Sequence, residues 1–303
     1  MIQYLEKLIL DNWIDWIGDK KPEGLDFLKI HAGQATRNKK VGFFIFKDNK
    51  PIFFIKTVRE SRHNEIIKRS FEKSKNIYRY LNNRSVPKPI YFGDYQGVYF
   101  YLETVALGKQ FHSCKAKKDL KIFLNWFFSF QKLMIEVGDK NKKDINIKLI
   151  DYIDNLVNDF CGLYKLEKNL KETIKDTSSM IKNSIDNLEI ASISQHGDLT
   201  PDNVLSAKGE IEVIDWDNFG DINLPLFDLL VFLQRWSGIR DISFIHKYSV
   251  IIKKYLKEFN IDKQALKLLV FCYYLLDFIR KKEILTAYDR KYLKARLREI
   301  KEL

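Results

Sequence analysis

The chain has 303 residues, of which 46% are apolar and 30% are charged. This balance is typical of a folded, water-soluble protein and excludes wholesale disorder. The 52 Lys and Arg exceed the 40 Asp and Glu by 12, and the pI is about 9.3. Because the lysines are scattered among Asn, Ile and Glu, the charge favours a solvated surface over a nucleic-acid-binding patch, although an anionic substrate also fits it.

Cysteine usage and apolar runs indicate the compartment. Cys114, Cys161 and Cys272 are odd in number and far apart, which argues against a disulfide framework or a zinc site and fits a reducing interior. The longest uncharged apolar run, Leu268 to Leu276, has about half the length of a membrane span. The first residues are amphipathic, so we expect no secretory leader there. We therefore expect a cytoplasmic protein without a membrane span.

The first hundred residues alternate between helical and strand patterns, in the order helix, hairpin, helix, hairpin. The predicted segments are 2–17, 41–46 with 52–55, 61–82, and 89–92 with 98–102. The stretches between the paired strands, Asp48 to Pro51 and Gly93 to Gly97, are rich in turn-forming residues. These patterns predict a small α+β unit that ends near Glu103.

From residue 104 onward the patterns are mostly helical. An aromatic helix is predicted over 117–137, and two lysine-rich amphipathic helices over 140–185. A strand-rich block at 193–215 precedes further helices that begin near Leu226. The chain is therefore expected to form two lobes, residues 1–103 and 104–303, joined by a short connection.

The residues that are most informative about chemistry lie in the strand-rich block. Asp198 and Asn203 are five apart on a stretch too rich in Gly and Pro for a helix, so one loop can direct both side chains into a cleft. A hairpin predicted over 204–214 returns Asp215 to the side of Asn203. Carboxylate and carboxamide oxygens suit Mg²⁺ that also binds phosphates. The pattern thus predicts phosphoryl transfer, in which one Asp accepts the proton of an attacking hydroxyl.

These motifs resemble a known family. The runs His196 to Asn203, Ile214 to Asp221 and Phe227 to Leu229 are similar to those of the aminoglycoside phosphotransferase and choline kinase superfamily, which are small-molecule kinases. The resemblance implies a two-lobed, protein-kinase-like α+β fold, with a small β-rich N-terminal lobe and a larger, mostly helical C-terminal lobe. Protein kinases match less well, because the loop reads His-Gly-Asp instead of His-Arg-Asp.

The resemblance also implies roles for individual residues of the loop and hairpin. Asp198 would be the catalytic base, and Asn203 and Asp215 would be the Mg²⁺ ligands. His196 would orient the loop instead of exchanging protons. Asp228 matches a later Asp of the family and would support the catalytic loop.

The nucleotide-binding residues are expected in the first lobe. Lys56, at the end of a strand, stands where the family places its phosphate-binding lysine. Its partner should be a helix acid, either Glu65 or Glu72, and we favour Glu72 from its distance to the following landmarks. The loop that covers the phosphates would lie at 31–38, where Gly33 allows close backbone approach, although no GxGxxG pattern is present.

The connection between the lobes is predicted to hold the base of the nucleotide. The stretch from Tyr101 to Gly108 resembles the interlobe hinge of the family. The backbone of Glu103 and Val105 would then form hydrogen bonds with a purine, and Gly108 would permit the turn away from it.

The function expected from these features is an ATP- or GTP-dependent O-phosphotransferase that requires Mg²⁺ and acts on a small hydroxylated metabolite. A sugar, an amino alcohol and an aminoglycoside all remain open as acceptors, as do the nucleotide and the oligomeric state. An alternative is a nucleotide-binding pseudokinase or scaffold, which the presence of Lys56, Asp198, Asn203 and Asp215 disfavours. A nucleic-acid-associated protein is a third possibility, but no binding motif supports it.

Overall fold

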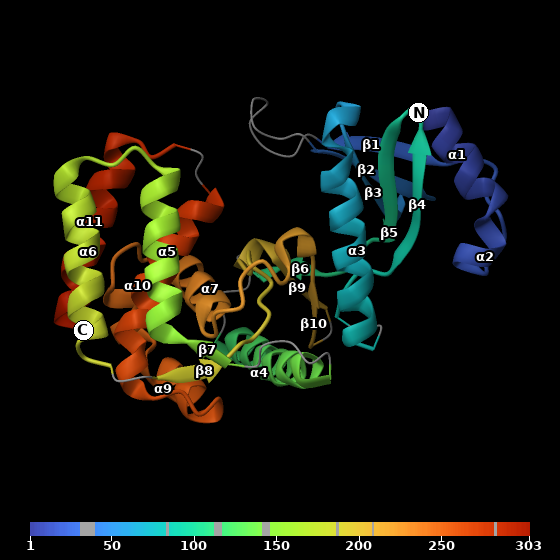
Figure 1. Cartoon of the computed structure of the whole chain (residues 1–303). Helices are drawn as coiled ribbons and strands as arrows, with labels where there is room; N and C mark the ends of the chain where they lie inside the picture. The colour runs from blue at the N-terminus through green and yellow to red at the C-terminus, as the bar shows by residue number, and fades with distance from the viewer. Residues whose placement is uncertain are drawn as a thin grey trace. The chain divides into compact units, whose positions relative to one another are not determined.

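The computed structural model describes residues 1–30, 40–82, 85–111, 117–140, 146–185, 188–207, 209–281 and 284–303. The chain divides into two compact units, Met1–Phe123 with Asp202–Asn218 and Leu124–Pro201 with Phe219–Leu303 (Figure 1). Antiparallel sheets dominate the first unit and α-helices the second, so the predicted α+β class is confirmed.

The first unit is built on a five-stranded antiparallel sheet with the strand order β1-β2-β3-β5-β4. Its strands are β1 (Asp26–Ile30), β2 (Lys40–Lys47), β3 (Lys50–Val58), β4 (Pro89–Tyr95) and β5 (Val98–Thr104). Both predicted hairpins are present, and each has a two-residue turn at positive φ, the geometry that matches the twist of the paired strands. The sequence pattern did not predict β1, because only Phe27 in this strand is even partly buried.

The two faces of this sheet pack against different helices. The helices are α1 (Ile2–Asp11), α2 (Trp13–Ile17) and α3 (Asn64–Tyr80), the last preceded by the 3-10 turn η1 (Ser61–His63). Figure 1 shows α1 and α2 on one side of the sheet and α3 on the other. The α1 and α2 side holds an apolar core of Leu5, Ile9, Trp13, Val41, Phe43, Ile45, Phe53, Ile55, Phe100 and Leu102.

The α3 side of the sheet carries the residues of functional interest. Val58 and Tyr101 pack there against Ile67 of α3. Lys56 is on the same face, because it precedes Val58 by two residues and pairs with Tyr101 across the β3–β5 ladder. The strand period thus directs Lys56 away from the apolar core.

A three-stranded sheet in the order β10-β9-β6 completes the first unit. It consists of β6 (Lys109–Gln110), β9 (Val204–Ala207) and β10 (Glu210–Val213), with the 3-10 turns η3 (Pro201–Asn203) and η4 (Trp216–Asn218) beside the hairpin. Because β9 pairs with β6, the predicted hairpin belongs to the same compact unit as the five-stranded sheet. This unit is therefore more extensive than the lobe of residues 1–103 that the sequence predicts.

The second unit is helical apart from a two-stranded sheet. Helix α4 (Lys117–Lys140) crosses the boundary between the units, and its residues from 124 onward belong to the second unit. The other elements of this unit are β7 (Asn146–Lys148), α5 (Leu149–Leu163), α6 (Lys168–Lys182), β8 (Glu189–Ala191), α7 (Phe227–Ser237), α8 (Ser243–Lys247), α9 (Ser249–Glu258), the 3-10 turn η5 (Lys263–Ala265), α10 (Leu266–Lys281) and α11 (Ala287–Glu302). The helices predicted over 117–137, within 140–185 and after Leu226 are present.

Helix α10 lies at the centre of the second unit. It packs against α5, α6, α7 and α11, and residues 268–275 are all buried. This explains the long apolar run in the sequence. In the part of the chain that the structure describes, no helix has both the length and the apolar character needed to cross a membrane.

Candidate active site

The β9–β10 hairpin brings Asn203 and Asp215 together, as the sequence predicts. Val204 pairs with Val213, and the N–H of Ile214 donates to the carbonyl oxygen of Asn203 at 3.0 Å. Asp215 follows the hairpin with φ at 63°, a left-handed conformation that short polar residues tolerate. Its side chain is 47% exposed, so its carboxylate is accessible to a ligand.

Lys56 lies within a cluster of three carboxylates. Its Nζ is 3.5 Å from Oε1 of Glu103, 3.5 Å from Oδ1 of Asp215 and 3.7 Å from Oδ1 of Asp217. Burial lowers the pKa of Lys56, but the charges of Asp217, Glu103 and Asp215 raise it by more, so the net pKa is well above its ordinary value. Lys56 is therefore a fixed positive charge beside the predicted metal ligand Asp215.

The predicted partner of Lys56 on α3 is not among these carboxylates. Glu72 and Glu65 are both exposed, because α3 turns Ile67, Ser70 and Ser74 inward instead. Glu103 takes the position beside Lys56, since it lies two residues from Tyr101 on the neighbouring strand and shares its face of the sheet. The pairing with Glu72 is thus replaced by a contact between adjacent strands.

Asp217 is a member of the cluster that the sequence analysis did not assign to the metal site. Its carboxylate forms ion pairs with Lys56 and with Lys40 of β2, and Lys73 of α3 donates to its carbonyl oxygen at 3.0 Å. Burial opposes ionisation, but Lys56 and Lys40 hold the pKa of Asp217 well below its usual range. The spacing Asp-Trp-Asp, with a second acid two residues after Asp215, was the signal that could have identified it.

Glu103 is buried, with 6% of its surface exposed. Burial raises the pKa of Glu103 to about 7, against the opposing charge of Lys56 and with the support of the neighbouring Asp217. The side chain of Glu103 thus pairs with Lys56, whereas the sequence predicts only a backbone contact with the nucleotide for this residue.

A pocket of about 840 Å³ opens over this cluster, entirely within the first unit. Lys40, Lys56, Glu103, Asn203, Asp215 and Asp217 form its polar part. Its apolar walls include strand residues of both sheets, residues of the connections and one residue of α3, namely Ile30, Val41, Phe44, Phe54, Ile66, Pro87, Val105, Ala106, Leu205 and Ile214. A concave, mostly apolar site with a few charged groups at one end has the size and character of a small-ligand site.

The predicted hinge lines the same pocket. Glu103 and Val105 are both part of its wall, as is Gly108. The N–H of Val105 donates to the carbonyl oxygen of Ile52 at 3.3 Å, so this amide already has a partner on β3. The predicted phosphate-covering residue Gly33 lies outside the residues that the structure describes.

Gly108 is expected to be intolerant of substitution. Its φ is 139°, and a methyl group there would lie 2.7 Å from the carbonyl oxygen of Ser206 in β9. We predict that Gly108→Ala lowers the free energy of unfolding by about 1–3 kcal/mol, as overpacking does elsewhere. Gly138→Ala in α4, where an added methyl group would meet no atom within 4 Å outside the neighbouring residues and backbone of its own helix, is the control. It should leave the free energy of unfolding in urea equal or slightly higher. Equal stability of Gly108→Ala and the wild type would contradict this account.

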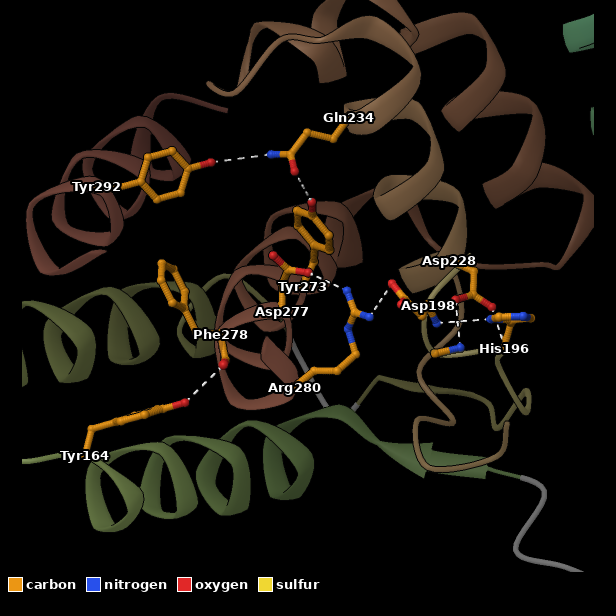
Figure 2. Close-up of polar contacts among 11 residues, drawn as sticks. Tyr164, His196, Asp198, Asp228, Gln234, Tyr273, Asp277, Phe278, Arg280 and Tyr292 are labelled. Atoms are coloured by element: carbon orange, nitrogen blue, oxygen red, sulfur yellow. Dashed lines mark hydrogen bonds and ion pairs between the residues drawn. The ribbon is translucent and has the colours of Figure 1, made fainter. Parts of the chain in front are cut away.

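The loop that carries Asp198 belongs to the second unit and is fixed by Asp228 (Figure 2). The backbone N–H of His196 donates to Oδ2 of Asp228 at 2.6 Å, and that of Gly197 to Oδ1 at 3.0 Å. The N–H of Asp198 donates to Nδ1 of His196 at 3.2 Å. Burial raises the pKa of Asp228 above its ordinary value, although His196 and the two backbone N–H groups partly oppose this rise. Asp228 and His196 thus have the contacts that orient this loop.

The carboxylate of Asp198 forms an ion pair with Arg280 of α10. The same guanidinium contacts Oδ1 of Asp277 at 3.0 Å, one turn earlier on the helix. Sequence reasoning assigned no role to Arg280. No local pattern marks it, because its contact with Asp198 depends on how α10 packs against the loop.

Comparison with known proteins identifies the family. Residues 62–251 match the family model described as the phosphotransferase enzyme family. The chain belongs to this family. The predicted enzyme class, a phosphotransferase, is thereby confirmed, and so is the resemblance to the aminoglycoside phosphotransferase and choline kinase superfamily. Among curated proteins, none matches the sequence.

Solved structures of phosphotransferases share the fold at low sequence identity. A thermostable mutant of aminoglycoside phosphotransferase APH(4)-Ia, in a ternary complex with ADP and hygromycin B, is 12% identical, with a TM-score of 0.56 over 96% of this chain and 97% of that one. The amicoumacin kinase hAmiN, in complex with AMP-PNP, Ca²⁺ and Ami, is 16% identical, with a TM-score of 0.56 over 99% and 94%. A GDP and kanamycin complex of APH(2")-IIia is 13% identical, with a TM-score of 0.55 over 100% and 98%. The predicted protein-kinase-like fold of these small-molecule kinases is confirmed.

Proposed function

We propose that this phosphotransferase moves the γ-phosphate of ATP or GTP to a hydroxyl group of a small metabolite. The observation that carries the proposal is the pocket of the first unit, where Lys56, Asn203 and Asp215 stand at the charged end of an apolar cavity. An apolar cavity of this kind suits a purine, and a fixed ammonium beside hard oxygen donors suits its phosphates. The complexes of similar fold with ADP, AMP-PNP and GDP support this use of the pocket.

The residues present fit a Mg²⁺ ion that is shared with nucleotide phosphates. Asp215 and Asn203 supply two hard oxygen donors beside one hairpin, which suits an ion that takes its other ligands from phosphate and water. Oδ1 of Asp217 is buried and accepts no hydrogen bond from the described residues. Asp215 and Asn203 would hold the ion, which would neutralise charge on the phosphates.

The remaining chemistry is assigned to protein side chains. The proton of the acceptor hydroxyl passes to the carboxylate of Asp198 while the acceptor oxygen bonds to the γ-phosphorus. The bond between the γ-phosphorus and the bridging oxygen breaks, and the nucleoside diphosphate leaves. Lys56 stabilises the negative charge on the phosphates during the transfer.

The metal ligand Asp215 gives a prediction that needs no acceptor. Asp215→Asn keeps a residue that tolerates φ of 63° but removes the charge, so the Mg²⁺-dependent gain in ATP affinity should fall about 10-fold or more. Calorimetric titrations with and without Mg²⁺ measure this gain. Asp48→Asn, an exposed turn residue at φ of 51°, is the matched control and should bind as the wild type does. An unchanged Mg²⁺ effect in Asp215→Asn would remove this residue from the metal site.

The class of acceptor can be identified from the release of nucleoside diphosphate. Release of ADP, or of GDP when GTP is supplied, should be screened with sugars, amino alcohols and aminoglycosides such as hygromycin B and kanamycin. At least one class is expected to stimulate release in the wild type. Slow hydrolysis that no acceptor stimulates would instead favour the pseudokinase alternative.

A further inference from the structure

Arg280, which contacts Asp198, lies beyond the residues that match the family model, which end at 251. We propose that Arg280 is a positioning residue that holds the carboxylate of the catalytic base in the orientation needed to accept the acceptor proton. The inference rests on the proposed function and concerns the second unit alone.

The backbone of the loop and the side chain of Asp198 are held by different groups. Asp228 and His196 fix the backbone through the N–H groups of residues 196–198. These contacts involve the backbone of Asp198 and not its carboxylate. Arg280 does contact that carboxylate, in an ion pair with Oδ1 (Figure 2). Arg280 therefore constrains the rotation of the Asp198 side chain, which determines where its carboxylate points.

Arg280 is itself held in place. Its side chain is only 11% exposed, and Nη2 lies 3.0 Å from Oδ1 of Asp277. The two carboxylates contact different nitrogens of the same guanidinium, Nη1 for Asp198 and Nη2 for Asp277. A planar guanidinium can satisfy both at once, whereas the single ammonium of a lysine is a poorer match for this geometry.

The helix that carries Arg280 is anchored to neighbouring elements of the unit. Near Asp277, the hydroxyl of Tyr164, which directly follows α5, donates to the carbonyl oxygen of Phe278 at 3.0 Å. One turn earlier, the hydroxyl of Tyr273 donates to Oε1 of Gln234 in α7 at 2.7 Å, and Nε2 of Gln234 donates to Tyr292 of α11 at 3.4 Å. The position of Arg280 is thus set by the core of the unit and not by the loop that it contacts.

Removal of the guanidinium is expected to affect the chemical step more than nucleotide binding. In Arg280→Ala the two carboxylates would lose their shared cation, and the Asp198 side chain would lose its orientation. We expect kcat to fall by about 10²-fold, while the KM for ATP stays unchanged. Arg280→Lys keeps the positive charge but lacks the planar guanidinium, so its kcat should lie between those of the wild type and Arg280→Ala. Guanidinium chloride added to Arg280→Ala should restore part of kcat, and urea at the same concentration should not.

The chain offers a matched control for loss of a buried arginine. Arg296 of α11 is also 11% exposed, and its Nη2 is paired three residues along the helix with Glu299 at 2.8 Å. Its contacts with Glu299 and Tyr292 lie within α11, so Arg296→Ala should keep the wild-type kcat even if it lowers Tm to a similar degree. Comparison of the two variants separates a role at Asp198 from a general loss of stability.

The experiment uses [γ-³³P]ATP with Mg²⁺, and follows both phosphate released to water and label transferred to a panel of sugars, amino alcohols and aminoglycosides. A loss of kcat in Arg280→Ala that guanidinium or the Lys variant partly restores supports the positioning role. A wild-type kcat in Arg280→Ala, or a loss that follows Tm and that neither guanidinium nor Lys restores, overturns it while the proposed function stands. If the wild type itself transfers no label and releases no phosphate, the proposed function fails and the inference fails with it.

Discussion

Replacement of Asp198 by Asn is expected to abolish turnover while nucleotide binding survives. The carboxamide cannot accept the acceptor proton, and a general base contributes about 10²–10⁴-fold to rate, so kcat should fall by at least about 10²-fold. Affinity for ADP should be unchanged, because the pocket proposed for the nucleotide is built from residues of the first unit. Steady-state nucleoside diphosphate release and calorimetry measure the two quantities.

The control for this substitution is Asp159→Asn, which makes the same chemical change at an exposed position of α5 in the same unit. It should leave kcat and Tm as in the wild type. Full activity of Asp198→Asn would show that another group accepts the proton. Loss of ADP binding in Asp198→Asn would show that the change disturbs more than the base.

Among the substitutions considered, replacement of Lys56 by Met should lower the free energy of unfolding the most. It leaves Glu103, Asp215 and Asp217 without the ammonium that lies between them, two of them with less than a tenth of the side chain exposed. Removal of one partner from buried ion pairs costs about 3–5 kcal/mol elsewhere. Lys47→Met in β2 of the same hairpin removes the partner of the exposed Asp19 and should cost much less stability than Lys56→Met.

The pH dependence of this loss has a defined sign. The folded-state pKa of Glu103 is raised to about 7, so the folded protein binds its proton more tightly than the unfolded chain, and the free energy of unfolding falls as pH rises through about 7. Without Lys56 the pKa of Glu103 should rise further. Lys56→Met should therefore lose less stability at pH 5 than at pH 8 in urea unfolding without divalent cations. The double variant with Glu103→Gln should recover part of the loss, and an equal loss at both pH values would contradict this account.

Sequence patterns could predict the parts of the site that depend on neighbouring residues. The turn residues at Asp48 and Asn49 position β3, and with it Lys56. The spacing of Asn203 and Asp215 around one hairpin fixes their proximity, because an antiparallel pair has only one register over so short a turn. Such features follow from local geometry, and the structure contains both.

The features that sequence reasoning did not reach depend on packing between distant elements. The preference for Glu72 rested on its distance to the following landmarks, which does not determine the buried face of α3. The helix buries Ile67, Ser70, Ser74 and Ile77 and leaves Glu72 exposed. Glu103 lies beside Lys56 only because β5 is inserted between β3 and β4 in the sheet. The contact of Arg280 with Asp198 similarly requires a buried helix near the end of the chain to reach the catalytic loop.

Transfer of label from [γ-³³P]ATP is the most direct test of the central claim that this chain phosphorylates a small hydroxylated molecule. The wild type and Asp198→Asn would be incubated in parallel with Mg²⁺ and sugars, amino alcohols and aminoglycosides, and label would be counted in products separated from ATP and inorganic phosphate. We predict a labelled acceptor with the wild type and background label with Asp198→Asn. Equal labelling by both proteins, or no labelled acceptor with the wild type, would contradict the account.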